Sequence, residues 1–172
     1  LSGRVVAGPV SGANVTVMPL LNTGALGSSL GSGTTDSQGY FSFDISGYVG
    51  PAVVLAQGGE YVDEATGNTI VADDLEMASL VVLTGAEEQT AHVTAATTIA
   101  ARRATVLATD PTIDALAALE NGVAMVEEYY GIAGILTTLP ADLTAGAVVA
   151  GPAAEYGALN AGFSQLADDR GI

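Results

Sequence analysis

The chain has 172 residues, of which 49% are hydrophobic, and its 19 acidic residues against four arginines give a formal net charge of -15. A charge of this sign repels phosphate backbones and anionic lipid surfaces, so nucleic acid is not an expected partner. Cysteine is absent, which excludes disulfides, thiolate nucleophiles and cysteine-bound metals. Aromatic residues make up only 5% of the chain, so we expect a core of small aliphatic side chains that lets backbones approach closely.

The first part of the chain, to about Thr94, has the pattern of a β protein. Short β-branched runs are separated by clusters of Gly, Pro, Asn and Asp. Phe41 and Phe43 alternate with polar residues, as in half-buried strands. We expect strands at residues 3–6, 13–19, 40–45, 52–56 and 75–83. Residues 21–33 are rich in Gly, Ser, Asn and Thr, and we expect them to form an exposed loop.

The second part of the chain has a helical pattern. Asp110 followed by Pro111 predicts a helix start, because a carboxylate caps free backbone N–H groups and proline suits the first helical position. Gly131 predicts its end. The apolar residues between them recur at spacings of three and four and should share one face: Leu116, Leu119, Val123, Val126 and Tyr130.

Two more helices are expected on either side of this one. Pro152 predicts the start of the last helix, whose apolar residues have the same helical spacing: Tyr156, Leu159, Phe163 and Leu166. An earlier helix at residues 97–109 would have an apolar face of Ile99, Val106 and Leu107 beside many alanines. The uncharged stretches after Glu128 and Asp142 are shorter than a bilayer requires, so no transmembrane helix is expected.

Three motifs near the N-terminus carry a family resemblance: LSGRVV at residues 1–6, SGANVTV at 11–17 and TTDSQGYFSF at 34–43. Together they resemble the carboxypeptidase regulatory-like domains, which are transthyretin-like Greek-key sandwiches common in bacterial surface proteins. The third motif also has a physical explanation. Asp36 can accept hydrogen bonds from backbone N–H groups of a tight turn, and Gly39 can adopt a positive φ.

Later motifs extend the resemblance: GGEYVDEATG at 58–67, VTAATTIAA at 93–101 and EYGALNAGFSQLA at 155–167. They are similar to the N-terminal region of large bacterial outer-surface lipoproteins. The resemblance implies an α+β fold, with a Greek-key antiparallel β-sandwich at residues 1–94 and a bundle of about three helices at 95–172, on or beside the sandwich. It also implies an extracellular or outer-surface location. Because Leu1 leads directly into a predicted strand, we expect a mature form or a fragment.

The residues offer little for catalysis. With one histidine, no cysteine and no lysine, the available pairs are a serine or threonine with His92, or two carboxylates. No Gly-x-Ser-x-Gly segment stands at a predicted strand-to-helix turn, where a nucleophile elbow would lie. Glycoside hydrolysis needs an aromatic-lined cleft, and tryptophan is absent. We therefore expect no enzymatic activity and a structural or surface role for His92.

Calcium is the cofactor left open. Asp36, Asp63 and Glu64 lie in oxygen-rich turns, and calcium prefers carboxylate and carbonyl oxygens. Neither turn has the spacing of an EF-hand loop, and ordinary turn chemistry explains both. We therefore expect no cofactor, with calcium as the alternative.

The leading functional hypothesis is a non-catalytic extracellular structural or adhesive surface protein, whose partners are further copies of itself or other surface proteins. In one version it is a filament subunit, in which the strand Gly3, Arg4, Val5 and Val6 completes the sandwich of the next copy. The alternative is a ligand-binding module of a larger surface lipoprotein, which recognises carbohydrate or peptide through residues 21–33 and 58–68.

Overall fold

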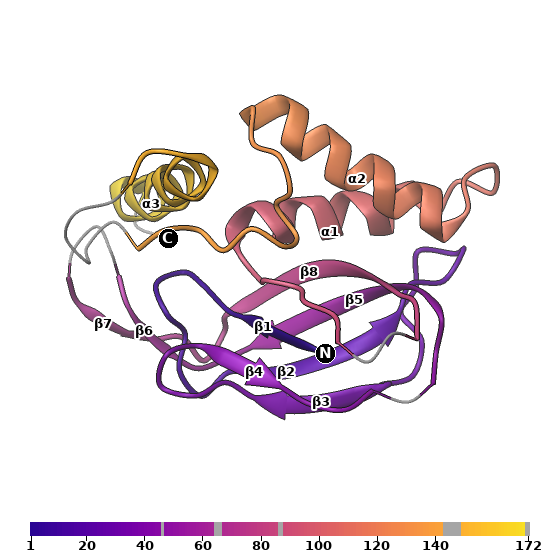
Figure 1. Cartoon of the computed structure of the whole chain (residues 1–172), viewed down its shortest axis with the longest axis horizontal. Helices are drawn as coiled ribbons and strands as arrows, with labels where there is room; N and C mark the ends of the chain where they lie inside the picture. Colours follow the sequence, from indigo (N-terminus) through magenta and orange to yellow (C-terminus); the bar gives the residue numbers. More distant parts are fainter. Residues whose placement is uncertain (46, 64–66, 86–87, 143–148, 171–172) are drawn as a thin grey trace.

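The computed structural model describes residues 1–172 except 46, 64–66, 86–87, 143–148 and 171–172, and only the backbone at 167 and 168. The fold is α+β, with antiparallel sheets followed by helices (Figure 1). The strands are β1 (Ser2–Arg4), β2 (Asn14–Pro19), β3 (Gly31–Thr34), β4 (Tyr40–Ser42), β5 (Gly50–Gln57), β6 (Glu60–Val62), β7 (Thr69–Val71) and β8 (Glu76–Leu83). The helices are α1 (Ala95–Leu107), α2 (Ala115–Tyr130) and α3 (Pro152–Arg170). The predicted class is confirmed, and each predicted strand and helix overlaps an observed one.

A four-stranded antiparallel sheet in the order β3-β2-β5-β8 forms the middle of the molecule. Its side chains alternate between two sides, as strand geometry requires. One side, which we call the valine face, belongs to a buried cluster that includes Val15, Val17, Val54 and Val81. The opposite side, which we call the helix face, contributes Val53, Ala78 and Leu80 to a second cluster. The sheet is therefore covered on both sides.

The valine face is covered by the N-terminal strand and β4, which pair with each other through Gly3 and Phe41. Val5, Phe41 and Val93 are buried in the same cluster as the valines of the central sheet. Because these side chains are β-branched or aromatic, the two β layers are joined by ordinary hydrophobic packing.

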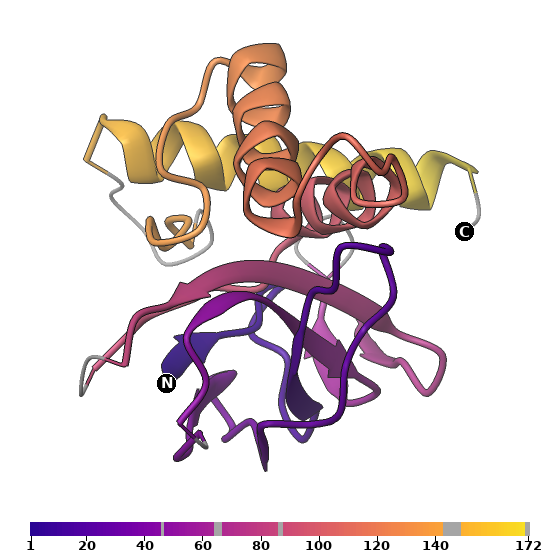
Figure 2. The same ribbon diagram turned by 90° about the vertical axis from the view of Figure 1, so that its right-hand side faces the viewer.

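The helix face is covered by α1, and Figure 2 shows all three helices gathered on this side of the strands. Thr94 caps α1 in a reciprocal capping box with Thr97. Of the expected apolar face of this helix, Leu107 packs partly buried against the cluster, whereas Ile99 and Val106 are 41% and 60% exposed. The buried face consists instead of small residues: Ala96, Thr97, Ala100, Ala101 and Ala104.

α2 begins later than predicted. Asp114, not Asp110, is its N-cap, and the Asp114 side chain accepts a hydrogen bond from the Ala117 N–H. Asp110 instead accepts from the N–H and hydroxyl of Thr112 at 2.9 and 2.7 Å, which holds a turn before the helix. Gly131 ends α2 with a φ of 69°, as predicted.

The expected apolar stripe of α2 is correct except at its first position. Leu119 and Val126 are buried, and Val123 and Tyr130 pack partly buried against the same cluster. Leu116 is 40% exposed. Its neighbour Ala115, in the same first turn, is buried in the cluster instead.

α3 begins at Pro152, as predicted. Tyr156 is fully buried, and its hydroxyl is hydrogen-bonded to Thr94 Oγ1 at 2.5 Å and to the Ile135 carbonyl at 3.3 Å. Burial raises the pKa of Tyr156 to about 12, so this hydroxyl is neutral at physiological pH. Leu166, in contrast, is 45% exposed, so the expected apolar stripe does not reach the last turns. Within the described residues, no helix is long and apolar enough to cross a bilayer.

Two strand regions were missed or misplaced. β3 begins inside the predicted loop 21–33 and pairs with β2. Its glycines lie under an aromatic ring, since a Cβ at Gly33 would come within 2.7 Å of Phe43. The glycines therefore allow close packing within a strand as well as turning the chain. The short β6–β7 hairpin was not predicted.

Candidate functional site

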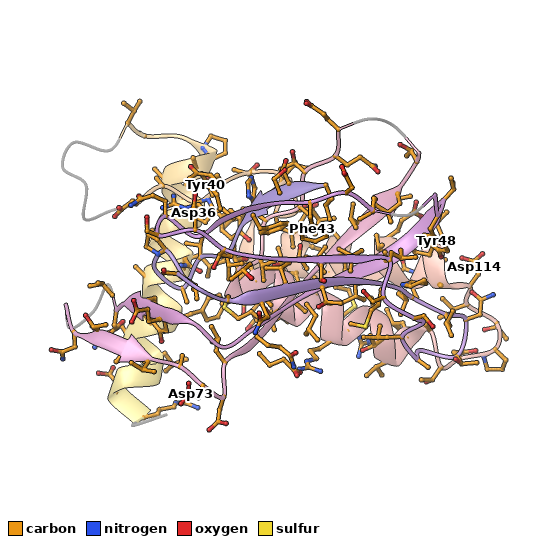
Figure 3. The ribbon with its side chains drawn as sticks, turned by 90° about the horizontal axis from the view of Figure 1, so that it is seen from below. Asp36, Tyr40, Phe43, Tyr48, Asp73 and Asp114 are labelled. Carbon is orange, nitrogen blue, oxygen red and sulfur yellow. The ribbon has the colours of Figure 1, made fainter. Side chains whose placement is uncertain are left out.

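One candidate site is a hollow of about 330 Å³ where one end of the central sheet meets the N-terminus of α2. We call it the Tyr48 hollow. Figure 3 shows Tyr48 and Asp114 together at the end of the molecule away from Asp36 and Tyr40. Its lining comes from three separate segments: Leu20, Leu21, Asn22, Tyr48, Pro51, Asp114, Ala115 and Leu116.

Two polar side chains of the Tyr48 hollow are fixed by backbone groups of α2. The Asn22 carbonyl oxygen Oδ1 accepts from the Ala115 N–H at 2.8 Å, and Asp114 Oδ1 accepts from the Ala117 N–H at 2.8 Å. Both bonds satisfy N–H groups that a helix cannot pair internally. The segment after β2 and the start of α2 are thereby joined.

An aromatic ring and an apolar rim complete the hollow. Tyr48 is half-buried, and its hydroxyl donates to the Pro51 carbonyl at 3.3 Å. Leu21 and Leu116 remain 42% and 40% exposed. Leu116 belongs to the expected apolar stripe of α2, but it lines the hollow instead of packing in the core.

The hollow offers hydrogen-bonding groups that the protein itself does not use. Among the described residues, no further hydrogen bond is made by the Asn22 amide NH₂ or by the second carboxylate oxygen of Asp114. An amide donor and a carboxylate acceptor beside a ring suit a ligand with several hydroxyl groups and an apolar face.

The predicted assembly strand has no free edge. Gly3 and Arg4 pair with Phe41 and Tyr40 on one side. On the other side, the Val93 N–H donates to the Arg4 carbonyl and the Val6 N–H donates to the Val93 carbonyl, at 2.9 and 2.8 Å. Val5 is part of the buried core. Gly3, Arg4, Val5 and Val6 are thus paired within their own chain, which counts against strand addition by this segment.

The calcium candidates are not brought together in the described part of the chain. Asp36 Oδ1 accepts from the N–H groups of Gln38 and Tyr40 at 2.8 and 2.9 Å, and Gly39 has a φ of 78°, so the predicted turn is confirmed. Asp63 directly follows β6. Its N–H donates to the Asn68 carbonyl, and its own carbonyl accepts from the Gly67 N–H. Glu64 lies outside the described residues.

No group of three or more histidine or acidic side chains among the described residues is placed to bind a metal. This leaves calcium as a prediction.

His92 is held by backbone groups. Its Nδ1 accepts the Arg4 N–H at 3.2 Å, and its own N–H donates to the Leu136 carbonyl at 2.9 Å. Burial, and then the positive charge of Arg4, lower the pKa of His92 below its ordinary value. These contacts tie the N-terminal strand and the segment before α3 to the start of the helical part.

Sequence reasoning found one part of the Tyr48 hollow and missed the rest. The predicted loop 21–33 supplies Leu21 and Asn22, whereas residues 58–68 do not contribute to it. Tyr48 and Asp114 were not singled out. Asp114 carries a local signal, since it is followed by the apolar run of α2, but Tyr48 carries none.

Comparison of the chain with protein-family models, with curated proteins and with solved structures finds no match.

Proposed function

We propose that this chain is a non-catalytic module of an extracellular bacterial surface protein, with a structural or adhesive role. The observation that supports this best is the use of its polar side chains. His92, Asp36 and Asp114 each accept hydrogen bonds from backbone N–H groups. Glu127 does the same for Gly134 and Ile135, at 2.7 and 3.1 Å. Groups used in this way stabilise loops and helix ends.

We further propose that the two β layers are the Greek-key sandwich that the sequence resemblance implies. The N-terminal strand and β4 pack across the valine face of the central sheet, and the turn of Asp36 and Gly39 has the expected conformation. In this proposal the helices are an added layer on the second face of one sheet.

Between the two forms of this role, adhesion is better supported than strand-mediated polymerisation. The strand Gly3 to Val6 would have to leave two sets of backbone hydrogen bonds and a buried cluster before it joined another copy. Light scattering of the purified chain, with and without calcium, tests this. A monomer in both conditions agrees with an adhesive module, whereas ordered polymers would support the filament hypothesis.

Catalysis is tested on the same sample with a panel of hydrolase substrates. We expect no turnover. Any activity that disappears in His92→Ala, while the variant keeps the circular dichroism spectrum of the original chain, would contradict the proposal.

The Tyr48 hollow favours a specific second candidate, a carbohydrate-binding module. A glycan array followed by calorimetry on any bound sugar tests it. Tyr48→Ala should abolish binding, because it removes the ring. Asn22→Asp keeps the oxygen that caps α2 but removes the NH₂ donor, so it should weaken binding without unfolding the chain. Asp36→Asn, in a turn away from the hollow, is the control. Absence of binding across a broad array would remove this candidate.

A further inference from the structure

A second concave surface lies between α1 and α2, and its lining is aliphatic and aromatic apart from one arginine. We call it the α1–α2 groove. It encloses about 340 Å³ and is lined by Ile99, Arg103, Met125, Val126, Tyr129 and Tyr130. Met125 is 46% exposed and Tyr129 is 82% exposed. Large apolar side chains gathered in this way on a surface often mark a binding site.

The groove is a product of the close packing of the two helices. A Cβ at Gly122 would come within 2.8 Å of the Ala100 carbonyl, so the helices nearly touch at this point. One turn further along α2, the larger side chains Met125 and Val126 line the groove.

The aromatic side of the groove contacts α3. The ring of Tyr130 packs edge-on against Tyr129 at 4.8 Å and against Phe163 of α3 at 5.6 Å. This aromatic wall is thus held by a third helix.

Arg103 is the charged group of the groove. Its Nε donates to Met125 Sδ at 3.3 Å, and a thioether is a weak acceptor. Among the described residues, Arg103 has no carboxylate partner, although the chain has 19 acidic residues.

Two other arginines differ from Arg103 in this respect. The neighbouring Arg102 forms an ion pair with Glu76, and Arg4 donates to the Gln38 carbonyl and lies over the Tyr40 ring. The remaining N–H groups of the Arg103 guanidinium are therefore available to a ligand, and their planar arrangement matches a carboxylate.

We propose that the α1–α2 groove binds a small amphipathic organic carboxylate. Its chain or ring lies against Ile99, Met125 and Tyr129, and its carboxylate pairs with Arg103. The volume is at the lower end of the range for small-molecule sites, which favours a small molecule over a protein segment. A second copy of this chain, with its charge of -15, is repelled. This site is separate from the Tyr48 hollow and does not depend on the proposed adhesive role.

The test compares octanoate with octan-1-ol, which has the same alkyl chain without the charge, by two-dimensional NMR titration of the whole chain. We expect octanoate to shift the resonances of Ile99 and Met125 and to bind at least about tenfold more tightly than the alcohol, as a charge-assisted hydrogen bond would provide. Arg103→Gln should weaken the binding of octanoate by about the same factor and leave the binding of octan-1-ol unchanged.

Arg102→Gln is the matched control, because it removes the adjacent arginine outside the groove and should leave octanoate binding as it was. Equal binding of acid and alcohol, or no shift of groove residues at millimolar octanoate, would overturn the proposal. So would a dimer, seen by light scattering, that Tyr129→Ser dissociates, since the groove would then belong to a second copy. A peptide that ends in leucine and binds more tightly than octanoate would replace the small molecule with a protein terminus.

Discussion

The two faces of the central sheet are packed by different means. The valine face is filled by β-branched and aromatic side chains, such as Val54 and Phe41, which meet across a conventional hydrophobic layer. On the helix face, α1 contributes mostly alanine, and Gly122 of α2 lies against its backbone. The valine face is packed by large side chains, whereas α1 packs against the helix face through small ones. A chain with few aromatic residues can thus form two cores by two routes.

The largest expected effect comes from adding volume where the helices nearly touch. Gly122→Leu should lower the free energy of unfolding by about 3 kcal/mol, because backbone atoms of Ala100 and Ala104 occupy the space and cannot rotate away. Urea unfolding followed by circular dichroism measures it. Ala124→Leu, at an exposed position of the same helix, is the control and should change stability by less than about 0.5 kcal/mol. Equal stability of the two variants would show that the helix contact is loose.

The next largest effect concerns Tyr156, the largest fully buried side chain among the described residues. Tyr156→Phe removes a buried hydroxyl that is bonded to Thr94 and the Ile135 carbonyl, so both lose a partner. We expect a loss of about 1.5 kcal/mol in the same unfolding measurement. Tyr129→Phe removes a hydroxyl from a residue that is 82% exposed and should have almost no effect. If both variants behaved alike, the Tyr156 hydroxyl would have no role in holding α3.

The ends of the helices show how far structure can be predicted from the sequence. The start of α3 at Pro152 and the end of α2 at Gly131 were predictable, because local chemistry decides both. The start of α2 was not. Asp110 and Asp114 are both able to cap a helix, and a side chain from a segment 93 residues away, Asn22, supports the second choice by binding the Ala115 N–H.

Long-range packing explains the other failures. A glycine-rich segment was expected to be a loop, and it became β3 because Phe43 lies across Gly33. Ile99 was expected to be buried, but α1 packs through alanines, which a hydrophobicity pattern undervalues. The Tyr48 hollow combines residues from three distant segments, so its composition could not be derived before the fold was known.

A smaller effect of opposite sign is expected on the valine face. The hydroxyl of Ser79 is buried and, among the described residues, has no hydrogen-bond partner. Ser79→Ala should therefore raise the free energy of unfolding by about 1 kcal/mol. Thr97→Val also deletes a buried hydroxyl, but this one donates to the Ala78 carbonyl at 2.8 Å, so the same deletion should lower stability. If both variants lost stability, a partner for Ser79 would have to exist in solution.

The smallest expected effect is a pH dependence located where the strands meet the helices. Burial, and then the charge of Arg4, lower the pKa of His92 in the folded chain below its ordinary value of 6.5. The unfolded chain then binds the proton more readily. The contribution of His92 to stability is therefore complete above about pH 6.5 and is lost as the pH falls through the lower folded value. Protonation of Nδ1 would also remove the acceptor of the Arg4 N–H.

Urea unfolding of the original chain and of His92→Gln between pH 8 and pH 5 isolates this contribution, because the carboxylates titrate alike in both proteins. Glutamine keeps an acceptor for the Arg4 N–H but does not titrate. We expect the stability of the original chain to fall more steeply than that of the variant below about pH 6.5. Parallel curves would mean that His92 is as well solvated in the folded chain as in the unfolded one. The contact between the N-terminal strand and the start of the helical part would then be open to water.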